Sequence, residues 1–387
     1  MGDKMRGKMY NKVENRFTRE FRLFFTFLQV FGIEIPNHSS QTKTMEVRGR
    51  KLISSFNPYP RYVLIVIFFL ASINGIIWII VLPKELKKAV QTFLTLLKVF
   101  FSALIFKKRR AIAQITEDLR KMLNALRPQF NFRMEKWMCA VYFIFIQILF
   151  ATWNIMYGFV ALRRSEISEE FFKEMGFPSH LPFFCSLILV ISEFCFSFIT
   201  KFIILLFVIY YSLVCRVIRL LFGRILDLLR LQIFIQEHEN LLDNYEKITK
   251  SMIKVDKALC FPTFVAITAS MIELFWTGYR LAFRKYITNK YVVGHVCTLN
   301  FNLTFQLLIM ISASMTNEMA KKAKDTLQCM KFRIPPDLRK TKLKEVCTKE
   351  SDLTLWKIYV VDRSLLITSF GTLLTYGILI GTLGEES

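Results

Sequence analysis

Residues 358–383, IYVVDRSLLITSFGTLLTYGILIGTL, form an apolar stretch in which the only charges, Asp362 and Arg363, stand near the start. The hydrocarbon core of a bilayer is about 30 Å thick, and roughly 20 helical residues cross it. The stretch meets that length, and threonine hydroxyls recur through it. It predicts a final membrane-spanning helix with one polar face.

The rest of the chain has the composition of a multi-span membrane protein. Hydrophobic residues make up 53% of the 387 residues, 39 of which are phenylalanine, and the mean hydropathy is +0.37. Backbone polar groups inside a bilayer must pair within their own segment, so each apolar run is expected to be a helix. We predict an all-α membrane protein with seven transmembrane helices at 62–82, 89–106, 137–162, 183–212, 258–281, 292–314 and 358–383. The second span is the weakest, because Lys98 stands in its middle.

Lysines and arginines alternate in number between the connections. The N-terminal tail 1–61 holds 12, and segments 107–136, 213–257 and 315–357 hold 9, 8 and 11. The other three connections, 83–88, 163–182 and 282–291, hold 3 each. Basic residues stay on the cytosolic side, which predicts a cytosolic N-terminus and an extracellular C-terminus. This orientation opposes a G-protein-coupled receptor, and it explains the net charge of +23 without a nucleic-acid partner.

The inner segments are long and helix-like. Segment 213–257 has apolar residues at three- and four-residue spacing, and 315–357 begins with a similar pattern. We expect both to extend transmembrane helices into the cytosol and to form an anchor bundle there. The domain plan is then a cytosolic tail at 1–61 and a channel-like domain at 62–383, whose last helix covers 363–383.

Catalytic and metal-binding patterns are absent from the sequence. None of the four histidines falls in a HExxH motif or at metal-ligand spacing with cysteine, and there is no Walker loop, GxGxxG or GxSxG. We therefore expect neither an enzyme nor a cofactor.

Polar residues inside the predicted spans are the candidates for ligand binding, because ionisable groups are costly in a bilayer. Glu193 and Glu273 fall in the outer halves of their spans, where aromatic and polar residues share their depth. An aromatic-lined pocket of this kind suits a small molecule, whereas an aromatic belt at the outer interface remains the alternative for the tyrosines and tryptophans. The predicted ligand-binding residues are Trp153, Asn154, Tyr157, Glu193, Glu273, Trp276, Tyr279, His295 and Asn302.

The final helix has two distinct faces on a helical wheel. Gly377 and Gly381 form a GxxxG notch that suits close helix packing. The other face, about 100° wide at 100° per residue, holds Ser364, Thr368, Gly371, Thr372, Thr375, Leu379 and Thr382. This face suits either hydrogen bonding between packed helices or the lining of a water-filled pore, with Leu379 as a hydrophobic constriction. A pore needs several copies of the chain in a ring.

The C-terminal residues resemble the signature of the insect gustatory receptor family. The similarity lies in WKIYVVDRSLLITSFGTLLTYGILI (356–380), above all in Val361–Leu366, Gly371-Thr372 and the Thr375-Tyr376 pair, with NEMAKKAKDTL (317–327) upstream. The resemblance implies a ligand-gated, non-selective cation channel in the plasma membrane of chemosensory neurons, made of four identical or related subunits. It adds Tyr376 to the pore-lining helix and implies an outer ligand pocket for a small-molecule tastant in each subunit.

The sequence departs from that family after Tyr376. The family continues to a Gln-Phe pair near the gate, whereas Gly381, Thr382 and Leu383 occupy this region here. Either Leu379 and Thr382 form the constriction, or the chain is a subunit that conducts poorly alone. The related insect odorant receptor class is the first alternative, although its signature lacks the Thr-Tyr pair. A transporter or scaffold is a further alternative, and no inverted repeat supports a transporter.

Overall fold

The structure is a computed structural model that describes residues 65–66, 68–70, 72–73, 86–126, 181–230, 238–283, 289–329, 352–365, 367–369, 371–372 and 375. Four long helices dominate this part of the chain: α4 (Leu86–Leu126), α7 (Leu181–Arg230), α8 (His238–Phe283) and α9 (Asn289–Cys329). A two-stranded hairpin follows, with β1 at Thr354–Leu355 and β2 at Tyr359–Val360. The predicted span 137–162 and the tail 1–61 lie outside the described residues.

The helices are longer than a bilayer requires. The 50 residues of α7 rise about 75 Å at 1.5 Å each, well over twice the thickness of a hydrocarbon core. Three segments within the described helices are long and apolar enough to cross a membrane: Cys195–Arg230, Asn240–Tyr279 and Val292–Cys329. The predicted spans 183–212, 258–281 and 292–314 fall in α7, α8 and α9, and 89–106 falls in α4. Each of these helices continues past the end of its predicted span.

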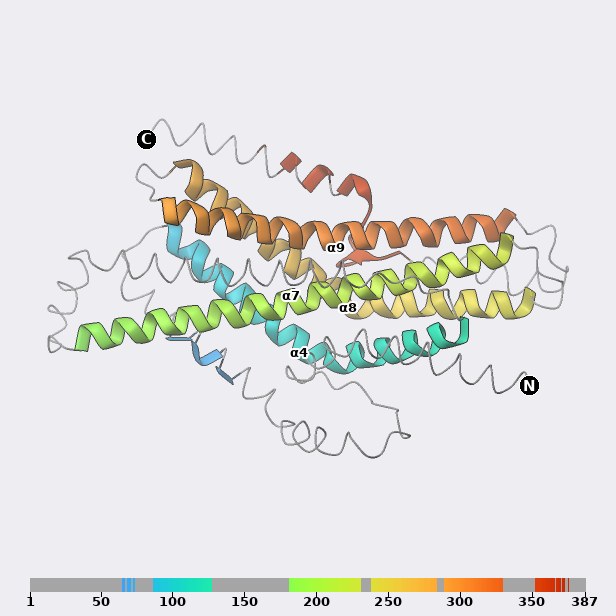
Figure 1. Cartoon of the computed structure of the whole chain (residues 1–387), viewed down its shortest axis with the longest axis horizontal. Coiled ribbons are helices and arrows are strands. Elements are labelled where there is room, and N and C mark those ends of the chain that lie inside the picture. Colours follow the sequence, from blue (N-terminus) through green and yellow to red (C-terminus); the bar gives the residue numbers. More distant parts are fainter. Residues whose placement is uncertain are drawn as a thin grey trace, which may run out of the picture.

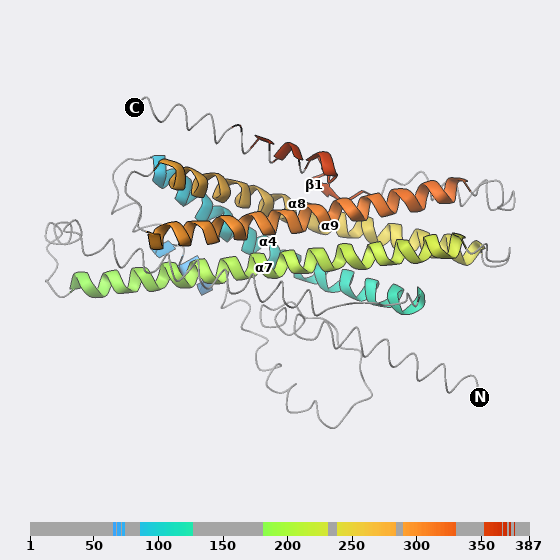
Figure 2. The ribbon, with the colours of Figure 1, turned by 45° about the horizontal axis from the view of Figure 1, so that its top comes forward.

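The four helices pack into one bundle. α7, α8 and α9 run along the long axis of the molecule, and α4 crosses them obliquely (Figures 1 and 2). α7 lies against α9, and α4 lies against α8. The largest fully buried side chains come from α4, α7 and α8, including Leu123, Phe222 and Tyr245. The rings of Phe222 and Tyr245 meet edge to face at 5.8 Å, which places the best-packed core toward the end of the bundle where α7 finishes and α8 begins.

The hairpin corrects two sequence predictions. Residues 354–357 were expected to belong to a helical extension, and the last span was expected to begin at 358. Instead, Thr354 pairs with Val360 and Leu355 with Tyr359 in antiparallel register, and the next helical residue is Arg363. The physical reason is that Leu353, Leu355 and Val361 bury their side chains against the bundle, which a continuous helix through this segment would not allow.

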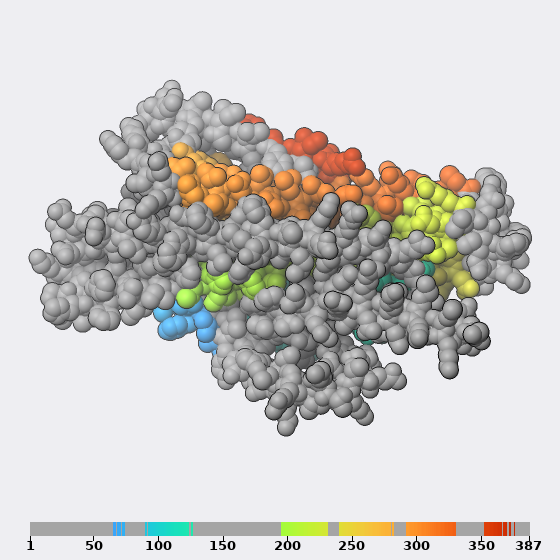
Figure 3. All heavy atoms as spheres, in the orientation of Figure 1, coloured from blue at the N-terminus to red at the C-terminus, as the bar shows by residue number. Residues whose placement is uncertain are grey.

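The described residues after the hairpin lie on the outside of the bundle. Residues 363–365, 367–369, 371–372 and 375 are helical, and in the space-filling view they form a ridge beside α9 (Figure 3). The helical residues therefore begin at 363, after the hairpin, and not at 358.

Candidate functional site

A buried ion pair joins α4 to α8. The Lys98 ammonium contacts the Glu273 carboxylate, and their side chains are only 13% and 14% exposed. Lys201 on α7 is 3% exposed, and its charge also acts on Glu273. Three helices therefore bring two cations and one carboxylate together. In a low-dielectric surrounding such charges persist only when they are paired.

Neutral polar groups complete this cluster. The Asn302 side chain lies within hydrogen-bonding reach of Glu273, and its amide donates to the Thr298 carbonyl oxygen at 3.0 Å. On α8, the Ser270 hydroxyl donates to the Asn302 carbonyl oxygen at 3.0 Å. We call Lys98, Lys201, Ser270, Glu273 and Asn302 the polar cluster. It places hydrogen-bonding groups from four helices at one depth, as a site for a polar small molecule needs.

Aromatic rings lie on α8 within two turns of Glu273. Trp276 and Tyr279 stack with ring centroids 5.8 Å apart and planes at 16°, so the two side chains share one face of the helix. His295 is half-buried on α9, one turn before Thr298. The two rings offer a flat apolar surface beside the charged groups.

The structure brings together only part of the predicted ligand-binding set. Glu273 and Asn302 meet directly, and Trp276 and Tyr279 lie close by on α8. Trp153, Asn154 and Tyr157 lie outside the described residues, and Glu193 falls within α7 but its side chain is not described. Sequence reasoning did not place Lys98 or Lys201 in the site. The signal was present, since both are ionisable groups inside predicted spans.

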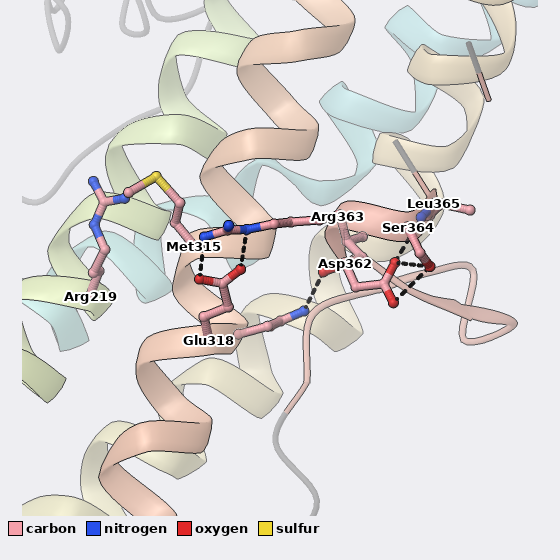
Figure 4. A network of polar contacts seen from close by, with 9 residues as sticks. Arg219, Met315, Glu318, Asp362, Arg363, Ser364 and Leu365 are labelled. Atoms are coloured by element: carbon pink, nitrogen blue, oxygen red, sulfur yellow. Dashed lines mark hydrogen bonds and ion pairs between the residues drawn. The ribbon is translucent and has the colours of Figure 1, made fainter. Parts of the chain in front are cut away.

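A second polar network fixes the start of the final helix (Figure 4). The Leu365 amide donates to Asp362 Oδ1 at 2.8 Å, so Asp362 caps the helix N-terminus. This hydrogen bond lowers the pKa of the Asp362 carboxyl below its ordinary value. Arg363 pairs with Glu318 on α9, with Nε–Oε1 and Nη2–Oε2 distances of 2.6 and 2.8 Å. Arg363 thus ties the first residue of the final helix to α9.

The hydroxyl face of the final helix points away from the bundle. Ser364, Thr368, Thr372 and Thr375 are all exposed. Thr368, Thr372 and Thr375 donate their hydroxyl protons to the carbonyl oxygens four residues earlier, at 2.8–2.9 Å. Their oxygen lone pairs remain available on the exposed side. The other predicted pore-lining residues, Tyr376, Leu379 and Thr382, lie outside the described residues.

The arrangement of the whole chain matches solved structures. The insect olfactory receptor OR5 from Machilis hrabei in complex with eugenol has a TM-score of 0.67 and 13% identity, over 96% of this chain and 99% of that receptor. The chain has the fold of an insect olfactory receptor. A second structure of OR5 gives a TM-score of 0.57, again at 13% identity, over 95% of this chain and 98% of that receptor. No family model and no curated protein match the sequence.

The match covers 96% of this chain and 99% of the receptor chain, so the likeness concerns the overall fold. At 13% identity the likeness concerns the path of the chain, and the residues that occupy each position are this chain's own.

Proposed function

We propose that the chain is a subunit of a ligand-gated, non-selective cation channel of the insect chemoreceptor kind, and that it detects a small-molecule tastant at the plasma membrane of chemosensory neurons. The observation that carries the proposal is the olfactory receptor fold over 96% of the chain. The Thr375-Tyr376 pair in the final helix supports the gustatory subtype, because it is the part of the sequence that resembles the gustatory receptor signature. Four identical or related subunits would surround one pore.

The chemistry of the final helix supports cation conduction. Its exposed hydroxyls give their protons to their own helix, and the oxygen atoms that face outward therefore act as acceptors. Oxygen acceptors replace part of a cation's hydration shell, whereas they offer nothing to an anion. A ring of four such helices would present rows of oxygen atoms at the levels of Thr368, Thr372 and Thr375.

The polar cluster supports recognition of a small molecule. Glu273 and Asn302 provide hydrogen-bonding groups, and the stacked Trp276 and Tyr279 provide an apolar surface within two turns of Glu273. OR5 is described in complex with eugenol, a small molecule, and by analogy this chain would also bind a small molecule, for which we propose the outer half of the bundle. The predicted residues Trp153, Asn154, Tyr157, Glu193 and His295 would complete that pocket.

A volatile odorant is the second candidate ligand. The specific observation in its favour is that the matched structures are olfactory receptors. The two candidates differ in the compounds that open the channel and share the same pore, so one panel of compounds separates them.

Current recording tests the function directly. The full chain is expressed in cells that lack chemoreceptors, and a panel of sugars, bitter plant compounds and volatile phenols is applied. We expect at least one class to evoke a current that sodium and potassium both carry. Thr372→Val should lower the single-channel conductance about twofold to tenfold, because a hydroxyl contact is worth about 0.5–1.5 kcal/mol.

The matched control for this variant is Thr326→Val. The Thr326 hydroxyl also donates to the carbonyl oxygen four residues earlier, Lys322 O at 2.8 Å, but it lies on α9 away from the final helix. Its replacement should leave the conductance unchanged. Equal conductance in Thr372→Val and the wild-type chain would remove the hydroxyl face from the pore, and silence with every compound would contradict the channel itself.

A further inference from the structure

Asn317 on α9 extends the hydrogen-bond ladder of the hairpin. Its amide nitrogen donates to the carbonyl oxygens of Leu353 and Val361 at 3.1 and 2.9 Å, and its Oδ1 accepts the Leu353 amide at 2.8 Å. The Val361 amide donates to the Leu353 carbonyl oxygen at 3.1 Å. All three residues are buried, with Asn317 8% exposed, Leu353 1% and Val361 0%. One side chain thus satisfies the backbone at both ends of the hairpin.

The other helix partner of the hairpin is α8. Asp256 Oδ1 accepts hydrogen bonds from the Thr354 amide at 2.7 Å and from the Thr354 hydroxyl at 2.9 Å. At the turn, the Trp356 ring packs on Phe261 and Phe264, with centroids 5.5 and 5.1 Å away. The hairpin is therefore attached to α8 along β1 and at the turn. It is attached to α9 at its open end, where Leu353 and Val361 lie side by side.

The final helix begins directly after the second attachment. Val361 is bonded to Asn317, and two residues later Arg363 is paired with Glu318. Between them, Asp362 caps the helix (Figure 4). Neighbouring residues of α9 thus hold both the end of the hairpin and the first residue of the final helix, and no free length of chain separates them.

We propose that the hairpin at 353–361, held by Asn317, is the mechanical link that makes the final helix follow a displacement of α8 relative to α9. The inference rests on the proposed function in one respect, because the final helix is taken as the pore helix. Asn317 is a positioning residue in this arrangement. It does not contact a ligand or a permeant ion, and it acts by fixing where the final helix starts.

The same two helices carry the polar cluster. Ser270 on α8 is bonded to Asn302 on α9, and the hairpin attachments Asp256 and Asn317 lie about 20 Å further along each helix at 1.5 Å per residue. α9 transmits displacement over that distance through its backbone hydrogen bonds, whereas Pro262 removes one of these bonds from α8 and favours a bend there, between the cluster and the hairpin attachment. A ligand that changes the α8–α9 spacing at the cluster therefore moves the base of the final helix through the hairpin.

Hydrogen exchange tests the link without any ligand. The full chain in lipid nanodiscs is compared with Asn317→Ala, and exchange is followed at 353–361 and at 363–369. We expect exchange to rise about tenfold in both segments, because loss of the Asn317 side chain frees the hairpin and the final helix loses its fixed start. The matched control is Asn300→Ala, an exposed asparagine on the same helix, which should change neither segment.

The outcomes show whether Asn317 couples the hairpin to the final helix or stabilises the hairpin alone. Faster exchange in the hairpin alone, with 363–369 unchanged, overturns the proposal, as does unchanged exchange in the hairpin. If Asn317→Ala does not fold, Asn317→Asp carries the same test. It keeps the acceptor for the Leu353 amide and loses both donors. The exchange rates of both segments should therefore rise above those of the wild-type chain, by less than the roughly tenfold rise expected for Asn317→Ala.

A flux measurement separates this proposal from the proposed function. Rubidium uptake into proteoliposomes is compared for the wild-type chain, Asn317→Ala and Asn300→Ala. If basal rubidium uptake changes at least about threefold in Asn317→Ala alone, the hairpin controls the pore as proposed. Equal uptake in all three conducting chains overturns the proposal. If no chain conducts, the channel function fails, while coupled exchange in the two segments still supports the mechanical link.

Discussion

At the scale of single residues, the most consequential contact is the pair of Lys98 and Glu273. The sequence marks both as ionisable groups inside predicted spans, and it treats Lys98 as a weakness of the second span. The structure gives Lys98 a partner 175 positions away in the sequence. No local pattern encodes a partner at that distance, so the sequence marks each residue as a candidate but does not predict that the two pair.

Replacing one member of this pair should be worse than replacing both. Lys98→Met leaves the Glu273 carboxylate with Lys201 still acting on it, so it should lower the free energy of unfolding by less than the roughly 3–5 kcal/mol that an uncompensated buried charge costs. The double variant Lys98→Met, Glu273→Met removes both charges, but it also removes the carboxylate that acts on Lys201, so it should recover only part of the loss. Thermal unfolding of the purified chain measures the difference.

The control for the pair is Lys107→Met, which removes an exposed lysine from the same helix. It should change the free energy of unfolding by less than about 0.5 kcal/mol. Equal destabilisation by the single and double variants would show that the two charges do not stabilise each other. A stable double variant that no longer responds to an active compound would support the ligand role of Glu273.

At the scale of elements, the hairpin shows where prediction from the sequence stops. Strands of two residues have no alternation to detect, and the turn lacks glycine, asparagine and proline. Trp356 and Lys357 instead adopt φ values of 50° and 59°, a region that costs most L-residues about 1–2 kcal/mol each. Contacts with Asn317, Asp256 and the two phenylalanines offset that cost, and all of them come from distant helices. The long helices, by contrast, follow from local apolar periodicity, although segment 213–257, expected to extend the fourth span, divides between the end of α7 and the start of α8.

Glycine in the turn should stabilise the hairpin. The Ile358 amide donates to the Leu355 carbonyl oxygen at 3.0 Å, and with two left-handed central residues this is a type I′ turn, whose second central position favours glycine. Lys357→Gly removes the strain and adds some chain entropy, for a net gain of about 0.5–1 kcal/mol. Exchange of the Val361 amide should then slow by about twofold to fivefold.

Lys357→Ala is the matched variant for this prediction. It removes the same side chain but keeps a Cβ in the left-handed conformation, so it should not slow the exchange. If alanine and glycine had the same effect, the lysine side chain rather than the backbone conformation would be the source of the change.

At the scale of the whole molecule, the fold follows from patterns that tolerate extensive substitution. The chain shares 13% identity with OR5 and still has a TM-score of 0.67. Apolar periodicity and helix length determine which helices pack together, and many different apolar residues give the same periodicity. The polar cluster and the Asn317 contacts depend on particular side chains, so the cluster was only partly predicted and the Asn317 contacts were not predicted. The orientation of the helices across the membrane is predicted from the distribution of lysines and arginines alone.

Antibody access to the two ends of the chain tests that orientation. The connections predicted to be cytosolic hold most of the lysines and arginines, and moving them across a bilayer is unfavourable. An epitope added after Ser387 should therefore stain intact cells, whereas the same epitope placed before Met1 should stain only after permeabilisation. The reverse pattern would invert every helix. It would then place the polar cluster toward the cytosol and the hairpin outside, so a ligand applied outside could not reach the cluster directly.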